Sequence, residues 1–131
     1  MENAKMRVES ADPKSDQRGW VYTPIDEVRL PLQRNTHVVL TLPGHVRGNH
    51  YHRRGTETML VLGPALVRVR EAGLVRETEV GAGQAVRCVF PPGVSHAYQN
   101  TGPAPAVIVC FNTETFDPVA PDVMKDVLID S

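Results

Sequence analysis

Three histidines and one glutamate form the chemically most informative pattern in this chain of 131 residues. The pattern is His-x-His-x4-Glu followed, after an intervening segment, by a third histidine: His50, His52, Glu57 and His96. Imidazole and carboxylate groups together bind divalent cations such as Zn²⁺, Mn²⁺, Fe²⁺ or Ni²⁺, and they can leave a coordination position open for a substrate. Residues two apart on a strand point to the same face, so His50 and His52 would converge. The spacing therefore predicts a divalent metal site built on β structure.

Short β-forming runs, separated by glycine and proline, dominate the chain from residue 19 onward. The predicted strands cover residues 37–42, 57–62, 65–70, 74–80, 85–90 and 106–111. Many short strands with regular turns are typical of an all-β sandwich or barrel, a class that includes the jelly rolls.

The two ends of the chain carry different signals. Residues 1–18 are polar and charged, so we expect a flexible, loosely docked N-terminal arm, followed by a single domain over residues 19–131. Near the other end, apolar residues at positions 123, 124, 127 and 128 follow a helical period. This period predicts a short amphipathic C-terminal helix over residues 122–129.

Charge and composition limit the classes of partner. A formal net charge of −1 gives no electrostatic reason to expect nucleic acid or an anionic membrane as a partner. The start of the chain lacks the apolar core of a signal peptide, and no apolar run approaches membrane-spanning length, so cytoplasmic residence is the expectation. Cys88 and Cys110 each lie in an apolar run, as small buried residues often do.

Three side chains near the histidine pattern are candidates for contact with a small-molecule substrate. Arg47 lies three residues before His50, and its guanidinium is suited to phosphate or carboxylate. An ordinary surface arginine in a loop would look the same in the sequence. Met59 and Phe90 are expected to form apolar walls of the pocket.

Tyr98 and the two histidines outside the pattern are interpreted from their places along the chain. If a strand continues through His96, the phenol of Tyr98 lies on the metal side and can donate a proton or hydrogen-bond a substrate. A tyrosine packed inside the barrel would have the same spacing. His45 follows the Pro43-Gly44 turn and is expected in a loop, where it could line the mouth of the site, whereas His37 is expected on ordinary strand surface.

The spacing of these residues resembles the paired motifs of the cupin superfamily. The two motifs read Gly44-x5-His50-x-His52-x4-Glu57-x5-Gly63 and Pro91-x-Gly93-x2-His96-x3-Asn100. The gap from Glu57 to Gly63 is one residue shorter than in the usual pattern, and Ala85 stands where the second motif normally opens with glycine. Neither departure touches a candidate ligand. The resemblance implies a cupin jelly-roll barrel that holds a metal.

One branch of the superfamily resembles the chain more specifically, namely the C-terminal cupin domain of bacterial capsular-polysaccharide nucleotide-sugar enzymes. The likeness lies in residues 43–52, in Thr56-Glu57-x2-Leu60-Val61, in Pro91-Pro92-Gly93-x2-His96 and in residues 116–122, with Arg18-Gly19-Trp20 upstream. This resemblance implies isomerisation or epimerisation of a 4-keto nucleotide sugar, or a similar carbonyl metabolite, in polysaccharide or secondary metabolism.

The segment Arg47-Gly48-x-His50-Tyr51 is also similar to the RmlC-like sugar epimerases of the deoxythymidine-diphosphate-rhamnose pathway. In those enzymes the arginine helps to hold the nucleotide sugar and the histidine is the catalytic base, which implies these roles for Arg47 and His50. The epimerases lack the second histidine and the metal, whereas His52 and Glu57 are present here. Because a histidine whose lone pair is on a metal cannot also accept a proton, His50 is either a ligand or a base.

Two other functions fit the same pattern. Cupins with these ligands include dioxygenases, decarboxylases and lyases, so a metal-dependent enzyme acting on a small oxo or hydroxy acid is the main alternative. A non-enzymatic ligand-binding module with a structural metal is the third interpretation. Small cupins commonly pair through exposed sheet edges, so we expect a homodimer, to which the apolar residues around Trp20 and Tyr22 would contribute.

Overall fold

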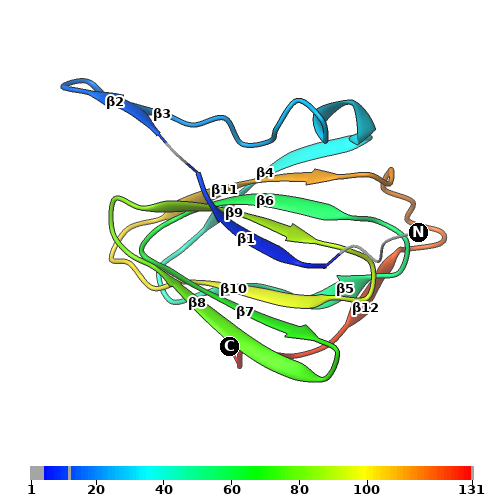
Figure 1. The fold of residues 1–131 in the computed structure, drawn as a ribbon. Coiled ribbons are helices and arrows are strands. Elements are labelled where there is room, and N and C mark those ends of the chain that lie inside the picture. Colours follow the sequence, from blue (N-terminus) through cyan, green and yellow to red (C-terminus); the bar gives the residue numbers. More distant parts are fainter. Residues whose placement is uncertain (1–4, 12, 131) are drawn as a thin grey trace.

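Two five-stranded antiparallel sheets face each other in the computed structural model, which describes residues 5–11 and 13–130 (Figure 1). The first sheet has the spatial order β1 (Arg7–Ser10), β9 (Ala85–Phe90), β6 (Glu57–Leu62), β11 (Ala106–Asn112) and β4 (Asn35–Thr41). The second has the order β12 (Val123–Lys125), β5 (Val46–His52), β10 (Ser95–Asn100), β7 (Ala65–Glu71) and β8 (Leu74–Val80). The predicted all-β jelly-roll architecture is confirmed.

The hydrophobic core fills the space between the two sheets. Alternation along β7 explains how the strands build it, because Val67 and Val69 are buried while Arg68 and Arg70 lie on the other face. The same alternation buries Cys88 and Phe90 on β9. The main core cluster comprises Met59, Val61, Ala65, Val67, Val69, Val80, Cys88, Phe90, Val94, Tyr98, Ile108 and Cys110. Both cysteines are free thiols, and burial raises their pKa values, that of Cys88 to about 12.

The N-terminal segment differs in part from the expected arm. Residues Arg7–Ser10 form the edge strand β1, which pairs with β9 from Arg7 opposite Val89 to Ser10 opposite Val86. Strands β2 (Lys14–Asp16) and β3 (Gly19–Val21) then form a hairpin that projects from the sandwich (Figure 1). Residues 1–4 and 12 of the expected arm lie outside the described residues. A 3-10 helix, η1 (Leu30–Leu32), precedes β4.

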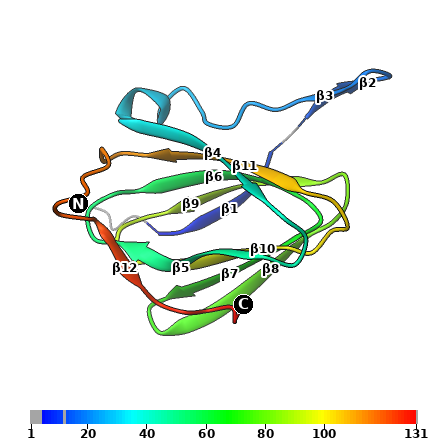
Figure 2. The same ribbon diagram turned by 180° about the vertical axis from the view of Figure 1, so that it is seen from behind.

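The predicted C-terminal helix is wrong. Residues Val123–Lys125 instead form β12, which pairs with the edge of β5, and the chain then continues without helix through residue 130 (Figure 2). The side chain of Asn49 accepts hydrogen bonds from the backbone N–H groups of Leu128 and Ile129, both of which are buried. A segment of eight residues is too short to be a stable helix alone, whereas the open edge of β5 offers backbone partners.

None of the described residues belongs to a helix with the length and apolar character needed to cross a bilayer.

Candidate metal centre

Three strands from both sheets bring the four predicted ligands together. His50 and His52 lie on β5, His96 lies on β10 directly opposite His50, and Glu57 opens β6 in the other sheet. One ligand atom from each of the four residues lies within 4.8 Å of the others. The sandwich therefore closes around the cluster that the sequence pattern predicted.

A glycine allows β5 and β10 to approach closely beside the cluster. Gly48 has a φ of +85°, and a Cβ at this position would lie 2.7 Å from the backbone oxygen of His96. Any other residue would clash with that carbonyl and strain the backbone. The register between β5 and β10 shifts here, between His96 and Ala97, as in a β-bulge. The Gly48 bulge therefore aligns His50 with His96.

The carboxylate of Glu57 is the centre of the cluster. Its Oε2 atom lies 2.6 Å from Nε2 of His52, 3.1 Å from Nε2 of His96 and 3.9 Å from Nε2 of His50. Burial raises the pKa of the carboxyl group, but the interactions with the three surrounding histidines outweigh burial and hold the pKa well below its usual range. Glu57 is therefore a buried anion that requires positive charge beside it.

The orientation of His96 requires a cation or a proton between its Nε2 atom and Glu57. Nδ1 of His96 donates a hydrogen bond to the backbone oxygen of Val94 at 3.1 Å, so in the neutral ring Nε2 carries a lone pair. That lone pair faces Glu57 Oε2, and two acceptors in contact repel each other unless a cation or a proton lies between them. Ligand atoms about 2.1 Å from one cation lie roughly 3.0–3.4 Å from each other. The donor set, its burial and the His96 contact thus fit a divalent metal.

A second carboxylate supports His52 from behind. Asp122 Oδ2 lies 3.7 Å from Nδ1 of His52, while its oxygens accept hydrogen bonds from the backbone N–H groups of Arg54 and Gly55. Burial raises the pKa of Asp122, but the N–H groups of Gly55 and Arg54 outweigh burial and lower it. A carboxylate behind a metal-binding histidine helps to orient the ring and makes it more basic.

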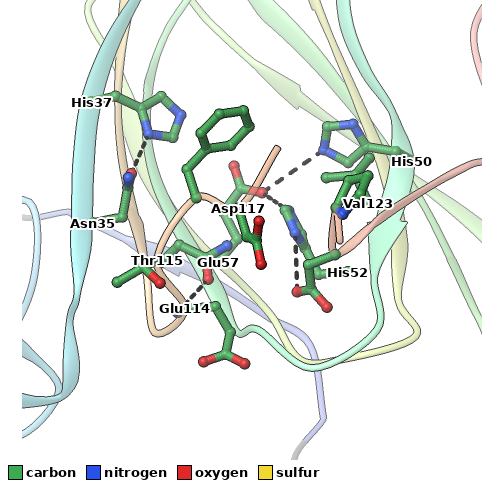
Figure 3. A pocket seen from close by; sticks show the side chains of 13 residues that line it. Asn35, His37, His50, His52, Glu57, Glu114, Thr115, Asp117 and Val123 are labelled. Carbon is green, nitrogen blue, oxygen red and sulfur yellow. Dashed lines mark hydrogen bonds and ion pairs between the residues drawn. The ribbon is translucent and has the colours of Figure 1, made fainter. Parts of the chain in front are cut away.

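A pocket of about 490 Å³ opens onto the cluster (Figure 3). His50, His52 and Glu57 lie at its inner end, and the remaining walls come from β4, from the end of β11 and from the loop between β11 and β12. The lining outside the cluster consists of Asn35, His37, Asn112, Glu114, Thr115, Phe116, Asp117, Pro121, Asp122 and Val123. A pocket of this size can hold a small metabolite.

The residues predicted to touch a substrate lie elsewhere. Arg47 donates hydrogen bonds to the backbone oxygen of Leu40 at 2.7 Å and to the hydroxyl of Thr41 at 3.3 Å, so its guanidinium joins β5 to β4 outside the pocket lining. Met59 is buried in the core cluster. Phe90 is also buried, and its ring stacks on His96 and not on the pocket wall.

Tyr98 lies inside the barrel and not on the pocket wall. Its side chain is 1% exposed and packs in the core cluster with Val67 and Ile108. Among the described residues its hydroxyl has no hydrogen-bond partner, and burial raises the pKa of its phenol. His96, Ala97 and Tyr98 are all buried, and Tyr98 is not among the residues that line the pocket.

His37 and the loop after β11 are the pocket residues that the sequence did not reveal. His37 is exposed on strand β4, as expected, and also lines the pocket, whereas His45 lies exposed outside it. Val38, Val39 and Leu40 are all apolar, so β4 shows no alternation that would identify its inward face. Residues 116–122 of the loop belong to the family likeness, but their spacing does not indicate a place in the pocket, because only the fold brings them there.

Residues 14–124 match the sequence model of the family described as the polysaccharide biosynthesis C-terminal domain. The chain belongs to this family. The matched region begins within the residues that the sequence assigned to the arm, and it contains all four candidate ligands. No curated protein matches the sequence.

Solved structures similar to this family member come from two groups. The capsular polysaccharide assembling protein CapF from Staphylococcus aureus is 26% identical with a TM-score of 0.66, and the match covers 90% of this chain and 34% of CapF. This chain thus spans about one third of the length of CapF. QdtA, a sugar 3,4-ketoisomerase from Thermoanaerobacterium thermosaccharolyticum solved with TDP, is 14% identical with a TM-score of 0.71, and the match covers 92% of this chain and 88% of QdtA.

A third structure supports the same fold. A dTDP sugar isomerase from Desulfovibrio desulfuricans G20 is 16% identical with a TM-score of 0.76, and the match covers 92% of this chain and 82% of that chain. At this identity the likeness establishes a shared fold. It agrees with the cupin jelly roll that the paired motifs implied.

Proposed function

We propose that this protein is a metal-dependent isomerase or epimerase that acts on a 4-keto nucleotide sugar. The observation that carries the proposal is the convergence of His50, His52, Glu57 and His96, three of which (His50, His52 and Glu57) line a pocket of about 490 Å³. A divalent cation held by these residues supplies the positive charge that polarises a carbonyl group and stabilises an enolate. Zn²⁺, Ni²⁺, Mn²⁺ and Fe²⁺ are all compatible with the ligands.

The similar structures support the class of substrate. QdtA is described as a sugar 3,4-ketoisomerase, and one of its variants was solved with TDP-4-keto-6-deoxyglucose. CapF is described as a capsular polysaccharide assembling protein, and its likeness covers 90% of this chain. The similarity of Arg47-Gly48-x-His50-Tyr51 to RmlC-like epimerases points to the same class. QdtA, CapF and the RmlC-like epimerases thus all support, as the substrate class, a nucleotide sugar with a ketone beside an acidic C–H bond.

The side chains of this pocket fit the reaction. His52, backed by Asp122, and His96, fixed by the Val94 carbonyl, are held in the orientation that presents Nε2 to Glu57. The carboxylate and amide groups that line the pocket can accept hydrogen bonds from, or donate them to, sugar hydroxyls. Removal of a proton next to the ketone and its return to another position would isomerise the sugar without any external oxidant.

Hydrogen exchange tests this function directly. The zinc-loaded protein is incubated with TDP-4-keto-6-deoxyglucose in heavy water, and NMR spectroscopy follows deuterium at the carbons beside the ketone. We expect incorporation with the wild-type protein and at least a 100-fold slower rate with His52→Ala, which removes a ligand. Absence of exchange with the wild-type protein in every metal form, together with oxygen consumption by the iron form on oxo acids, would favour the dioxygenase alternative.

We also propose that the protein forms a homodimer through its exposed apolar strands. Trp20 and Val21 on the β2–β3 hairpin are 51% and 69% exposed, and Val38 and Leu40 on the outer face of β4 are 66% and 54% exposed. Exposed apolar side chains that cluster at a sheet edge are typically covered by a partner. Light scattering should give twice the monomer mass, and Leu40→Glu should shift the mass to that of the monomer.

A further inference from the structure

We infer that His37, oriented by Asn35, is the catalytic residue that removes and returns the proton in this pocket. The inference rests on the proposed function, because it assigns the base for that reaction. The base needs a lone pair directed into the pocket and must not be a ligand of the cation.

The strand register places His37 on the same concave face as Glu57. Asn35 pairs with Asn112, which in turn pairs with Glu57, so these three residues form one row across β4, β11 and β6. His37 is two residues further along β4 and therefore points to the same side as Asn35. Strands lie about 4.8 Å apart, so the row spans roughly 10 Å from β4 to β6. That separation leaves room for a sugar ring between His37 and the cluster.

The position of His50 agrees with this picture. Figure 3 shows His37 and His50 on opposite walls of the pocket, each with its ring directed from its strand into the space between them. His50 belongs to the second sheet and His37 to the first. A substrate whose ketone lies at the cluster would therefore present its adjacent carbons towards His37.

The contact with Asn35 sets the tautomer of His37. Nδ1 of His37 lies 2.9 Å from Oδ1 of Asn35. An amide oxygen only accepts hydrogen bonds, so Nδ1 carries the proton and Nε2 of the neutral ring carries the lone pair. Within residues 5–11 and 13–130, Nε2 of His37 has no recorded hydrogen-bond partner. Asn35 thus acts as a positioning residue that keeps the basic nitrogen available.

The other ionisable groups of the pocket are already engaged. Three are candidate metal ligands, namely His50, His52 and Glu57. Asp122 accepts hydrogen bonds from two backbone N–H groups behind His52, and Asp117 accepts them from the N–H groups of Val119 and Ala120. Glu114 lies 3.3 Å from the Nε atom of Arg54. His37 is therefore the pocket side chain best suited to accept a proton.

The proton transfer balances within the substrate and His37. The C–H bond next to the ketone breaks, and its proton forms an N–H bond with Nε2 of His37. The electron pair of the broken C–H bond becomes the C=C bond of the enolate, and the carbonyl oxygen takes the negative charge. The imidazolium then returns the proton to carbon, and the carbonyl re-forms. Return to the neighbouring former carbonyl carbon, after a hydroxyl proton moves to oxygen, gives the ketoisomer. An epimer forms when a water molecule protonates the first carbon on its opposite face and the imidazolium releases its proton to solvent.

A comparison of two histidine variants tests the assignment. His37→Ala removes the base, while His45→Ala removes an exposed histidine outside the pocket and serves as the matched control. With TDP-4-keto-6-deoxyglucose in heavy water, we expect His37→Ala to slow deuterium incorporation by about 10²–10⁴-fold, the usual contribution of a general base. The KM, the zinc content and the TDP affinity should stay within about twofold of the wild type, and added imidazole should restore part of the rate.

Asn35→Ala distinguishes positioning from catalysis. It should slow exchange by about tenfold through loss of tautomer control, since the ring of His37 remains. If the wild-type protein exchanges deuterium and His37→Ala exchanges at the same rate, the role of His37 is refuted while the proposed function stands. If the wild-type protein shows no exchange with this sugar although it binds zinc, the proposed function fails and the assignment of His37 fails with it.

Discussion

The ring of Phe90 lies flat against the imidazole of His96, with centroids 4.1 Å apart and planes that differ by 3°. Both side chains are buried, and Nδ1 of His96 is held by the Val94 carbonyl. The stacking and the hydrogen bond together leave the imidazole a single orientation, in which Nε2 faces Glu57. Phe90 therefore contributes to the site by fixing a ligand from behind.

Replacement of Phe90 should affect stability and metal affinity together. Phe90→Leu leaves a gap beside His96 and should lower the free energy of unfolding by about 1–3 kcal/mol, measured by urea denaturation. Zinc affinity should also fall, because His96 gains rotational freedom. Phe116→Leu is the control, since Phe116 is 78% exposed and its change should cost less than about 0.5 kcal/mol. An unchanged zinc affinity in Phe90→Leu would show that the stacking does not orient His96.

Neutralisation of Glu57 should remove the metal while the fold survives. Glu57→Gln keeps the shape of the side chain but removes the negative charge, so zinc affinity should fall by about 100-fold or more, given that even residues behind the ligands contribute 10–100-fold. Chelator competition followed by elemental analysis measures the effect. Glu79→Gln on the exposed side of β8 is the control. Full zinc content in Glu57→Gln would exclude this residue as a ligand.

The free energy of unfolding should depend on pH through Asp126 in the C-terminal segment. Hydrogen bonds from Ser95 at 2.5 Å and from Arg70 at 2.5 and 2.7 Å hold the pKa of this carboxyl group below its usual value. Since the folded-state pKa is below the unfolded one, the stabilisation is complete above about pH 5 and is lost as the pH falls through the folded-state pKa. Asp126→Asn should lower the free energy of unfolding by about 1–2 kcal/mol at pH 7.

The difference between the wild type and Asp126→Asn should shrink as the pH falls from about 5 to about 3. Asp130→Asn, which changes an exposed carboxylate in the same segment, is the control and should behave as the wild type at every pH. A difference that stays constant from pH 7 to pH 3 would mean that the charge of Asp126 does not contribute to folding.

Arg47 should matter for folding more than for nucleotide binding. Its two hydrogen bonds to Leu40 and Thr41 join β5 to β4, so Arg47→Ala should lower the free energy of unfolding by about 1–2 kcal/mol. Affinity for TDP, measured by calorimetry, should change less than threefold. Arg76→Ala on exposed β8 is the matched control. The opposite result, a large loss of TDP affinity with unchanged stability, would assign the phosphate contact to Arg47 as its motif implied.

Local patterns in the sequence were sufficient to predict several strands and the four candidate metal ligands. β-forming runs bounded by glycine and proline are a local property, so the runs at residues 57–62, 74–80 and 85–90 predicted β6, β8 and β9 with their observed bounds. The ligands were also predictable, because the alternation of β5 turns His50 and His52 to one side and the motif carries Glu57 and His96 with them. These features depend on neighbours in the chain or on a recognisable spacing.

Which other side chains lie near the candidate ligands depends on how distant strands pair. The side-chain direction of His37 depends on the pairing of β4 with β11. The hydrogen bond from the Arg47 guanidinium to the backbone oxygen of Leu40 depends on the turn that joins β4 to β5. The tail became β12 because an unpaired edge of β5 lay beside it, a partner that a helical period cannot reveal. Contacts between distant strands are set by register and by competition for backbone hydrogen bonds, and neither is encoded in local spacing.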